Sequence, residues 1–299
     1  MKKCLTLILA LLMLAMPAAA SAETVVTSFF PIYLFTLNLL SGIDDVEVFN
    51  LAAPGTGCLH DYQLQTGDMK MLARADAFLI NGAGMEGYLK GVFETFPQLP
   101  IADASIGIEL LEDCSDHSHD DEDHDHAYNA HIWLDVQNAI LMVNNLADGL
   151  MAALPDHAGA IAANRDAYVT RLTALDAELT AALSAVPQKD IITFHEAFPY
   201  FAQAYGLNVA AVVNRDPDDA LSPRQLAELC KTVSALGAPP LFIEPQYEDK
   251  AAQTIARETG ATIHTLDPIV TGPQTDVPLT LYEDVMLQNL AVLLEALCN

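Results

Sequence analysis

One long amphipathic segment, residues 155–186, divides this 299-residue chain. Its apolar residues recur at helical intervals and form a single stripe: Ile161, Tyr168, Leu172, Leu175, Leu179, Leu183 and Val186. Pro155 can begin the helix and Pro187 ends it. A helix of about 30 residues is roughly 45 Å long, which is enough to join two lobes. We therefore expect an N-terminal lobe at residues 23–154 and a C-terminal lobe at residues 187–299.

Short runs rich in β-branched and apolar residues lie on both sides of this segment. They predict strands at residues 24–30, 46–51, 77–81, 190–194, 207–213, 241–244 and 262–266. Helical patterns separate these runs. The alternation indicates an α/β protein with two lobes, each a mostly parallel sheet flanked by helices, joined by one long rigid helix. In such a protein a ligand is expected between the lobes, at the carboxyl ends of the strands.

Residues 1–22 have the organisation of a secretory signal peptide. Lys2 and Lys3 precede an apolar run at residues 5–16, and small residues at 20–22 allow cleavage near Ala22. The apolar run is too short to cross a bilayer as a helix. Cys4 lies before the run, so it cannot be the lipidated cysteine of a lipoprotein, and no lipobox follows. A soluble periplasmic protein is the expectation.

The charge balance bears on which partners are reasonable. Asp and Glu number 40 against 13 Lys and Arg, which gives a formal net charge of −27. Nucleic acid is therefore excluded as an expected partner, since its binding needs a basic surface. An acidic surface is compatible with cation binding but does not by itself indicate it.

Four cysteines remain once the signal peptide is removed: Cys58, Cys114, Cys230 and Cys298. An oxidising compartment permits disulfides, and three pairings are open. We favour Cys230 with Cys298, which would tie the C-terminal helix to the second lobe. Cys58 and Cys114 then form a second candidate pair. The absence of a CxxC sequence excludes a cysteine zinc knuckle and a thioredoxin-type site.

Residues 112–126 differ in kind from the rest of the chain. Eight acidic residues and four histidines fill these fifteen positions, and the histidines are His117, His119, His124 and His126. So polar a segment predicts a solvated loop. A plain acidic run would need only a solubilising role. Imidazoles alternating with carboxylates, however, can hold zinc, copper or nickel weakly, so the loop is interpreted as an auxiliary weak metal site.

Other chemically active side chains occur singly. His60, His195 and Asp267 each follow a predicted strand, and His131 comes just after the acidic loop. Successive separations of 71, 64 and 72 residues mean that only the fold could bring them together. Taken one at a time, an isolated histidine in such a position is more often a hydrogen-bonding loop residue than a metal ligand.

The segments around these residues resemble those of a known family, and this resemblance outweighs the interpretation of each histidine as an ordinary loop residue. They run in order through essentially the whole mature chain: Pro54-Gly55 with His60-Asp61-Tyr62 and Asp68; His131-Ile132-Trp133-Leu134 with Asn138-Ala139; Thr193-Phe194-His195-Glu196-Ala197-Phe198 with Tyr200-Phe201; and Glu244-Pro245-Gln246 followed by Leu266-Asp267-Pro268. Together they resemble the signature segments of the zinc/manganese (cluster A-I) substrate-binding proteins of ABC importers, closest to the zinc-specific periplasmic members.

The resemblance implies a metal site between the lobes. It assigns His60, His131 and His195 as nitrogen ligands, with Asp267 or a water as the oxygen ligand. It also makes Glu244 a candidate for orienting a ligating imidazole. In the family the third position is His in zinc binders and a carboxylate in many manganese binders, and three imidazoles with one oxygen suit tetrahedral zinc. The implied cargo is Zn(II), the implied partner is the membrane permease of a metal ABC importer, and a monomer is expected.

Three alternatives stay open at this stage. One is a manganese-binding member of the same family, and another is a surface adhesin of the same fold. The third, from another class, is a secreted zinc hydrolase, since three histidines and an open position also describe a catalytic zinc. Against the hydrolase, His195-Glu196 begins like HExxH, but Pro199 stands where the second histidine would be. No enzymatic activity is therefore expected.

Overall fold

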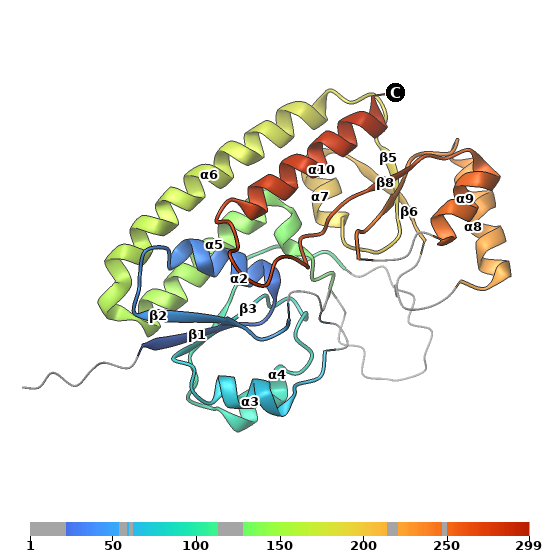
Figure 1. Ribbon diagram of the computed structural model, residues 1–299. Coiled ribbons are helices and arrows are strands. Elements are labelled where there is room, and N and C mark those ends of the chain that lie inside the picture. Colours follow the sequence, from blue (N-terminus) through green and yellow to red (C-terminus); the bar gives the residue numbers. More distant parts are fainter. Residues whose placement is uncertain are drawn as a thin grey trace, which may run out of the picture.

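The computed structural model describes residues 22–53, 59, 62–112, 128–213, 221–246 and 250–298. These residues form two four-stranded sheets, in which every strand pair is parallel, connected by one long helix (Figure 1). The predicted fold class, two parallel-sheet lobes flanked by helices, is confirmed.

The N-terminal sheet has the strand order β2-β1-β3-β4. Its strands are β1 (Glu23–Thr27), β2 (Val46–Asn50), β3 (Ala77–Ile80) and β4 (Ile101–Asp103). One face is covered by α2 (Phe30–Leu39) and α5 (Val136–Ala153), and the other by α3 (Thr66–Leu72) and α4 (Leu89–Thr95) (Figure 1). The central strand β3 is buried along its whole length, as expected for a parallel sheet covered on both faces.

The C-terminal sheet repeats this arrangement with the order β6-β5-β7-β8. Its strands are β5 (Asp190–Thr193), β6 (Asn208–Val212), β7 (Leu241–Ile243) and β8 (Ile263–Thr265). Helix α7 (Pro199–Tyr205) lies on the side of the long helix, and α8 (Pro223–Ala235) and α9 (Lys250–Thr259) cover the outer side (Figure 1). In both sheets the strand order reverses between two central strands, which is where α/β proteins place ligands.

The long helix α6 spans Ala158–Ser184 and follows a 3-10 turn, η2 (Pro155–His157). Its buried residues are six members of the predicted stripe, from Ile161 to Leu183, so the helical interpretation is confirmed. Helix α10 (Leu281–Leu297) runs beside α6 and packs against it and α2 (Figure 1). Among the described helices none is long and apolar enough to cross a membrane.

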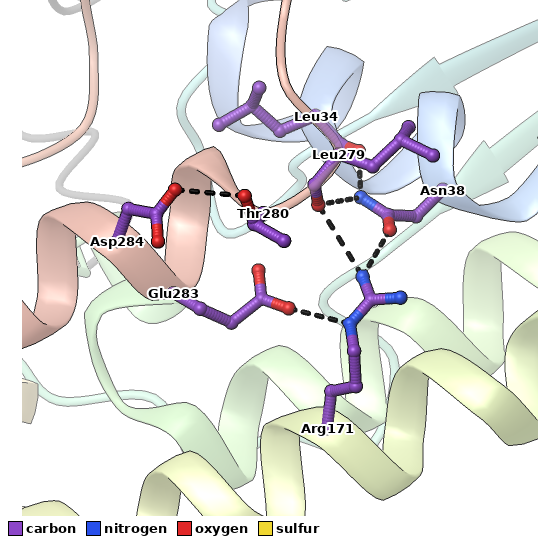
Figure 2. Close-up of polar contacts among 7 residues, drawn as sticks. All are labelled: Leu34, Asn38, Arg171, Leu279, Thr280, Glu283 and Asp284. Carbon is purple, nitrogen blue, oxygen red and sulfur yellow. Dashed lines mark hydrogen bonds and ion pairs between the residues drawn. The ribbon is translucent and has the colours of Figure 1, made fainter.

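A polar cluster ties α6 to α2 and α10 (Figure 2). The Nε of Arg171 on α6 donates to Glu283 Oε1 on α10 at 2.8 Å. The same guanidinium donates to the side-chain oxygen of Asn38 on α2. Asn38 Nδ2 in turn donates to the carbonyl oxygen of Leu279 at 3.0 Å, just before α10. Segments from both halves of the chain therefore meet around one arginine.

Two secondary-structure predictions need correction. The strand predicted at residues 24–30 ends at Thr27, and α2 begins at Phe30, because Pro31 fits the first turn of a helix but cannot donate to a sheet ladder. Strand β4 was missed because it has only three residues and follows Pro100, which leaves too short a run to show a strand pattern.

The disulfide predicted between Cys230 and Cys298 does not form in the structure, where both cysteines are free. Cys230 lies on α8 and contacts the core of the outer side of the C-terminal lobe. Cys298 is exposed at the end of α10, which packs on α6. The prediction was wrong because sequence alone could not show that these two helices lie on different sides of the lobe. Cys58 and Cys114 lie outside the described residues.

Candidate metal centre

His131 lies at the junction of the lobes, where it begins the 3-10 turn η1 (Ile132–Leu134) that leads into α5. The turn is held by Trp133, whose ring is fully buried and 5.1 Å from that of Phe29. The Trp133 indole N–H donates to the carbonyl oxygen of Pro268, in the C-terminal lobe, at 2.7 Å. His131 itself is 2% exposed, so its ring is fixed within the protein rather than presented to solvent.

His195 lies two residues beyond β5, one of the two central strands of the C-terminal sheet. His195 is 5% exposed. The Nε2 atoms of His195 and His131 are 3.2 Å apart, and the two rings are nearly perpendicular, at 78°. The structure thus brings together two of the predicted ligands, one from each lobe.

This spacing can be compared with the geometry of a bound zinc ion. Two nitrogens at 2.0–2.1 Å from a tetrahedral zinc lie about 3.3 Å apart. The observed Nε2 separation of 3.2 Å therefore suits one ion held by both imidazoles. Neutral imidazole nitrogen is also among the preferred donors of zinc.

One orientation of the His131 ring is favoured by Asn129, a residue that sequence reasoning missed. Asn129 Oδ1 accepts a hydrogen bond from the backbone N–H of His131 at 3.0 Å and lies 3.1 Å from His131 Nδ1. Because an amide oxygen only accepts, Nδ1 must carry the proton. His131 Nε2 then carries the lone pair of the ring and lies 3.2 Å from His195 Nε2. An Asn two residues before a histidine was the available signal, but such a pair is too common to interpret alone.

Asp267 follows β8 and is held by its backbone. Its N–H donates to Asn289 Oδ1 at 2.9 Å, and its carbonyl oxygen accepts from Asn289 Nδ2 at 2.8 Å. The carboxylate accepts the backbone N–H of Ile269 at 2.7 Å. Burial raises the pKa of the Asp267 carboxyl, and this hydrogen bond opposes the shift. Helix α10 thereby fixes the position from which Asp267 could act.

Glu244 directly follows β7, the other central strand of the same sheet. It is 2% exposed, and its Oε2 accepts a hydrogen bond from Gln246 Nε2 at 2.5 Å. Burial raises the pKa of Glu244 to about 8; the Gln246 hydrogen bond opposes the shift and the charge of Asp267 adds to it. Glu244 and Asp267 are thus electrostatic neighbours. That Glu244 orients an imidazole stays a prediction.

The other predicted site residues cannot be placed. His60 and the four loop histidines, His117, His119, His124 and His126, lie outside the described residues. Within the described part of the chain, no group of three or more His, Cys, Asp or Glu side chains could hold a metal ion. Among the described residues, the structure therefore places two of the predicted ligands, His131 and His195, in contact; that they bind a metal, and that Asp267 joins them, stays a prediction.

Comparisons with known proteins agree on the family. Residues 25–296 match the family described as "ZnuA: Zinc-uptake complex component A periplasmic". The zinc-binding protein AdcA of Streptococcus pyogenes serotype M1 is 33% identical over 260 residues, which cover 82% of this chain and 50% of AdcA. The high-affinity zinc uptake system protein ZnuA of Haemophilus ducreyi is 30% identical over 288 residues, covering 88% of this chain and 89% of that protein.

A solved structure with the same fold is that of the SBP FpvC from Pseudomonas aeruginosa in complex with Mn2+. Its TM-score is 0.80 at 27% identity, and the match covers 92% of this chain and 98% of FpvC. The chain spans about half the length of the AdcA relatives that it matches. Since the family match extends over nearly the whole chain, this protein belongs to the ZnuA family of zinc-uptake complex component A proteins.

Proposed function

We propose that this chain is the extracytoplasmic binding protein of a zinc importer, which captures Zn(II) between its lobes and delivers it to the membrane permease of an ABC transporter. The observation that carries the proposal is the 3.2 Å approach of two buried imidazole nitrogens, one from each lobe. The names of the AdcA and ZnuA relatives, which are zinc-binding and zinc-uptake proteins, support zinc as the cargo.

The proposed ligand set is His60, His131 and His195, completed by Asp267 or a water. Three neutral imidazoles and one oxygen match a four-coordinate zinc, whereas manganese takes more oxygen ligands. Glu244, which is buried beside Asp267, is proposed to orient a ligand rather than bind the ion.

Capture also has a proton requirement. Since His131 Nδ1 holds its proton against Asn129, a hydrogen bond across the 3.2 Å contact must use the proton on His195 Nε2. Zinc therefore competes with that proton, which must move to Nδ1 of the same ring so that His195 stays neutral, and one hydrogen bond is replaced by two zinc–nitrogen bonds. Both imidazoles must be neutral for this exchange.

The proposed function also requires that the chain be exported and that zinc reach the site. Residues 1–22 are proposed to direct the chain to the periplasm, and residues 23–154 and 187–299 to form the two lobes. His117, His119, His124 and His126 are proposed to collect zinc weakly before it enters the site.

Deleting residues 112–126 should remove the weakly bound extra zinc ions and leave one tight site. Loss of the tight site on deletion would contradict a purely auxiliary loop.

The test of the proposed function is a competitive metal titration of the mature protein and of a His195→Glu variant, with zinc, manganese and a chromophoric chelator. We expect the wild type to take up one zinc tightly and to reject manganese at equal concentration, and the variant to lose that preference. Equal binding of both metals by the wild type would favour the alternative, a manganese carrier. FpvC, which has the same fold, was solved in complex with Mn2+. No tight binding would overturn the function itself.

A further inference from the structure

Asn129 contacts the two ligand-bearing segments at once. Its Oδ1 accepts from His131 on the N-terminal side. Its Nδ2 donates to the carbonyl oxygen of Glu196, the residue after His195, at 2.7 Å. Asn129 is 5% exposed. A single buried amide thus holds one ligand directly and the backbone beside the other.

The orientation of this amide follows from its partners. A backbone N–H only donates and a carbonyl oxygen only accepts, so the amide oxygen must face His131 and the amide nitrogen must face Glu196. Turning the amide over would break both bonds. The network therefore specifies the His131 tautomer rather than merely permitting it.

Tyr200 holds Asn129 from the C-terminal lobe. Its hydroxyl donates to the carbonyl oxygen of Asn129 at 2.8 Å and accepts the backbone N–H of Leu111 at 2.9 Å. Asn129 N–H also donates to Leu111 O at 2.9 Å. Tyr200 is 3% exposed and lies on α7, which follows the His195 segment. The three residues form a closed set of hydrogen bonds that spans the lobe junction.

We propose that Asn129 is a positioning residue for metal capture: its oxygen fixes the metal-binding tautomer of His131, and its amide nitrogen, together with Tyr200, keeps the His131 and His195 segments in register and slows metal release. This rests on the proposed capture of zinc by these two histidines. Hydrogen-bond partners of ligating histidines are worth about 10- to 100-fold in metal affinity, which sets the size of the expected effect.

Three substitutions separate the two roles. Asn129→Ala removes both and should weaken zinc binding about 10- to 100-fold. Asn129→Asp keeps an oxygen for His131 but loses the donor to Glu196, so it should retain the His131 tautomer and release zinc faster. Tyr200→Phe removes only the hydroxyl and should also release zinc faster with the tautomer unchanged.

The readouts are zinc affinity and dissociation rate by chelator competition, and the imidazole tautomers of the metal-free mature protein by 1H–15N NMR at fixed pH. The wild type should show His131 protonated at Nδ1, and Asn129→Ala should lose this preference. Asn145→Ala is the matched control, because the Asn145 side chain also hydrogen-bonds to the backbone, through Nδ2 to the carbonyl oxygens of Ala104 and Ile106, but neither of these partners belongs to a ligand segment. It should lower stability and leave zinc affinity unchanged.

The outcomes are distinguishable. A wild type without tight zinc binding overturns the proposed function, whereas the tautomer measurement needs no metal and still tests Asn129. If the wild type binds zinc tightly and Asn129→Ala binds and releases it unchanged with the same His131 tautomer, the positioning role is wrong. Should Asn129→Ala fail to fold, Asn129→Asp and Tyr200→Phe decide, and unchanged release rates in both would contradict the proposal.

Discussion

A buried carboxyl group of the N-terminal lobe, that of Glu86, is connected through Asn81 to the segment that carries His131. Glu86 is 3% exposed and accepts the backbone N–H groups of Asn81 at 2.7 Å and Gly82 at 3.1 Å. The Asn81 side chain donates to the carbonyl oxygen of Ala130, next to His131, at 3.0 Å. Burial raises the pKa of Glu86 to about 7, and hydrogen bonds to the carboxylate oppose the shift in part.

This raised pKa predicts a pH-dependent stability. The folded state binds the Glu86 proton more tightly than the unfolded chain, whose ordinary value is 4.5, so stability is lost as the pH rises from 4.5 to 7 and levels off above. Relative to Glu86→Gln, the wild type should lose roughly 3 kcal/mol of unfolding free energy across that window. Urea denaturation at a series of pH values measures this. Parallel pH profiles for the two proteins would refute it.

Individual site residues could be predicted from the sequence only where they lie in a recognisable motif. The resemblance to family segments makes His131 and His195 candidate ligands, and the structure brings the two together. Asn129 could not be predicted, because its partners Glu196 and Tyr200 lie 67 and 71 residues away. Which backbone groups a buried amide meets is decided by how the lobes pack, and no local pattern records it.

At the scale of elements, α6 is held to its neighbours by apolar packing and by the Arg171 cluster of Figure 2. The Glu283 side chain is 12% exposed and that of Arg171 is 40% exposed. Arg171→Met would leave Glu283 buried without this cation and should lower the unfolding free energy by about 2–3 kcal/mol.

The matched control is Arg224→Met on α8. Arg224 pairs with Glu228, but the two side chains are 89% and 60% exposed, so the change should stay within about 0.5 kcal/mol. Equal effects of the two substitutions in urea denaturation would show that the cluster does not hold the helices.

Helix α5 packs closely on the edge strand β4, and substitutions at glycine test this packing. A Cβ at Gly149 would lie 2.3 Å from the Cβ of Ala102 on β4, so Gly149→Ala should destabilise by about 1–2 kcal/mol, after allowing for the better helix propensity of Ala. In α4, a Cβ at Gly91 meets nothing within 4 Å, and Gly91→Ala should stabilise by about 0.5–1 kcal/mol. Thermal or urea unfolding that ranks the two variants the other way would contradict this packing.

The elements themselves were largely predictable. The stripe of α6 was visible because one face of a long helix is buried throughout. The β4 strand was not, since three residues at a sheet edge give no periodicity. The pairing of Cys230 with Cys298 failed for a different reason: it depended on which side of the lobe each helix covers, and that follows from packing rather than from local pattern.

For the whole molecule, two similar sheets are joined into one structure by contacts that cross between the lobes. Trp133 contacts Pro268, 135 residues later, through its indole N–H, and Tyr282 donates its hydroxyl to the carbonyl oxygen of Trp133 at 2.6 Å. The long helix predicted the two lobes, and the alternation of strands and helices predicted their parallel sheets. Their mutual placement, which brings His131 to His195 across 64 residues, was implied only by the family resemblance.

The most direct test of zinc capture between the lobes is anomalous X-ray diffraction at the zinc edge from crystals of the zinc-loaded mature protein. We expect one strong peak at about 2.0–2.1 Å from the Nε2 atoms of both His131 and His195. A tightly bound zinc found elsewhere, with these two imidazoles still in contact with each other and no metal between them, would contradict the account.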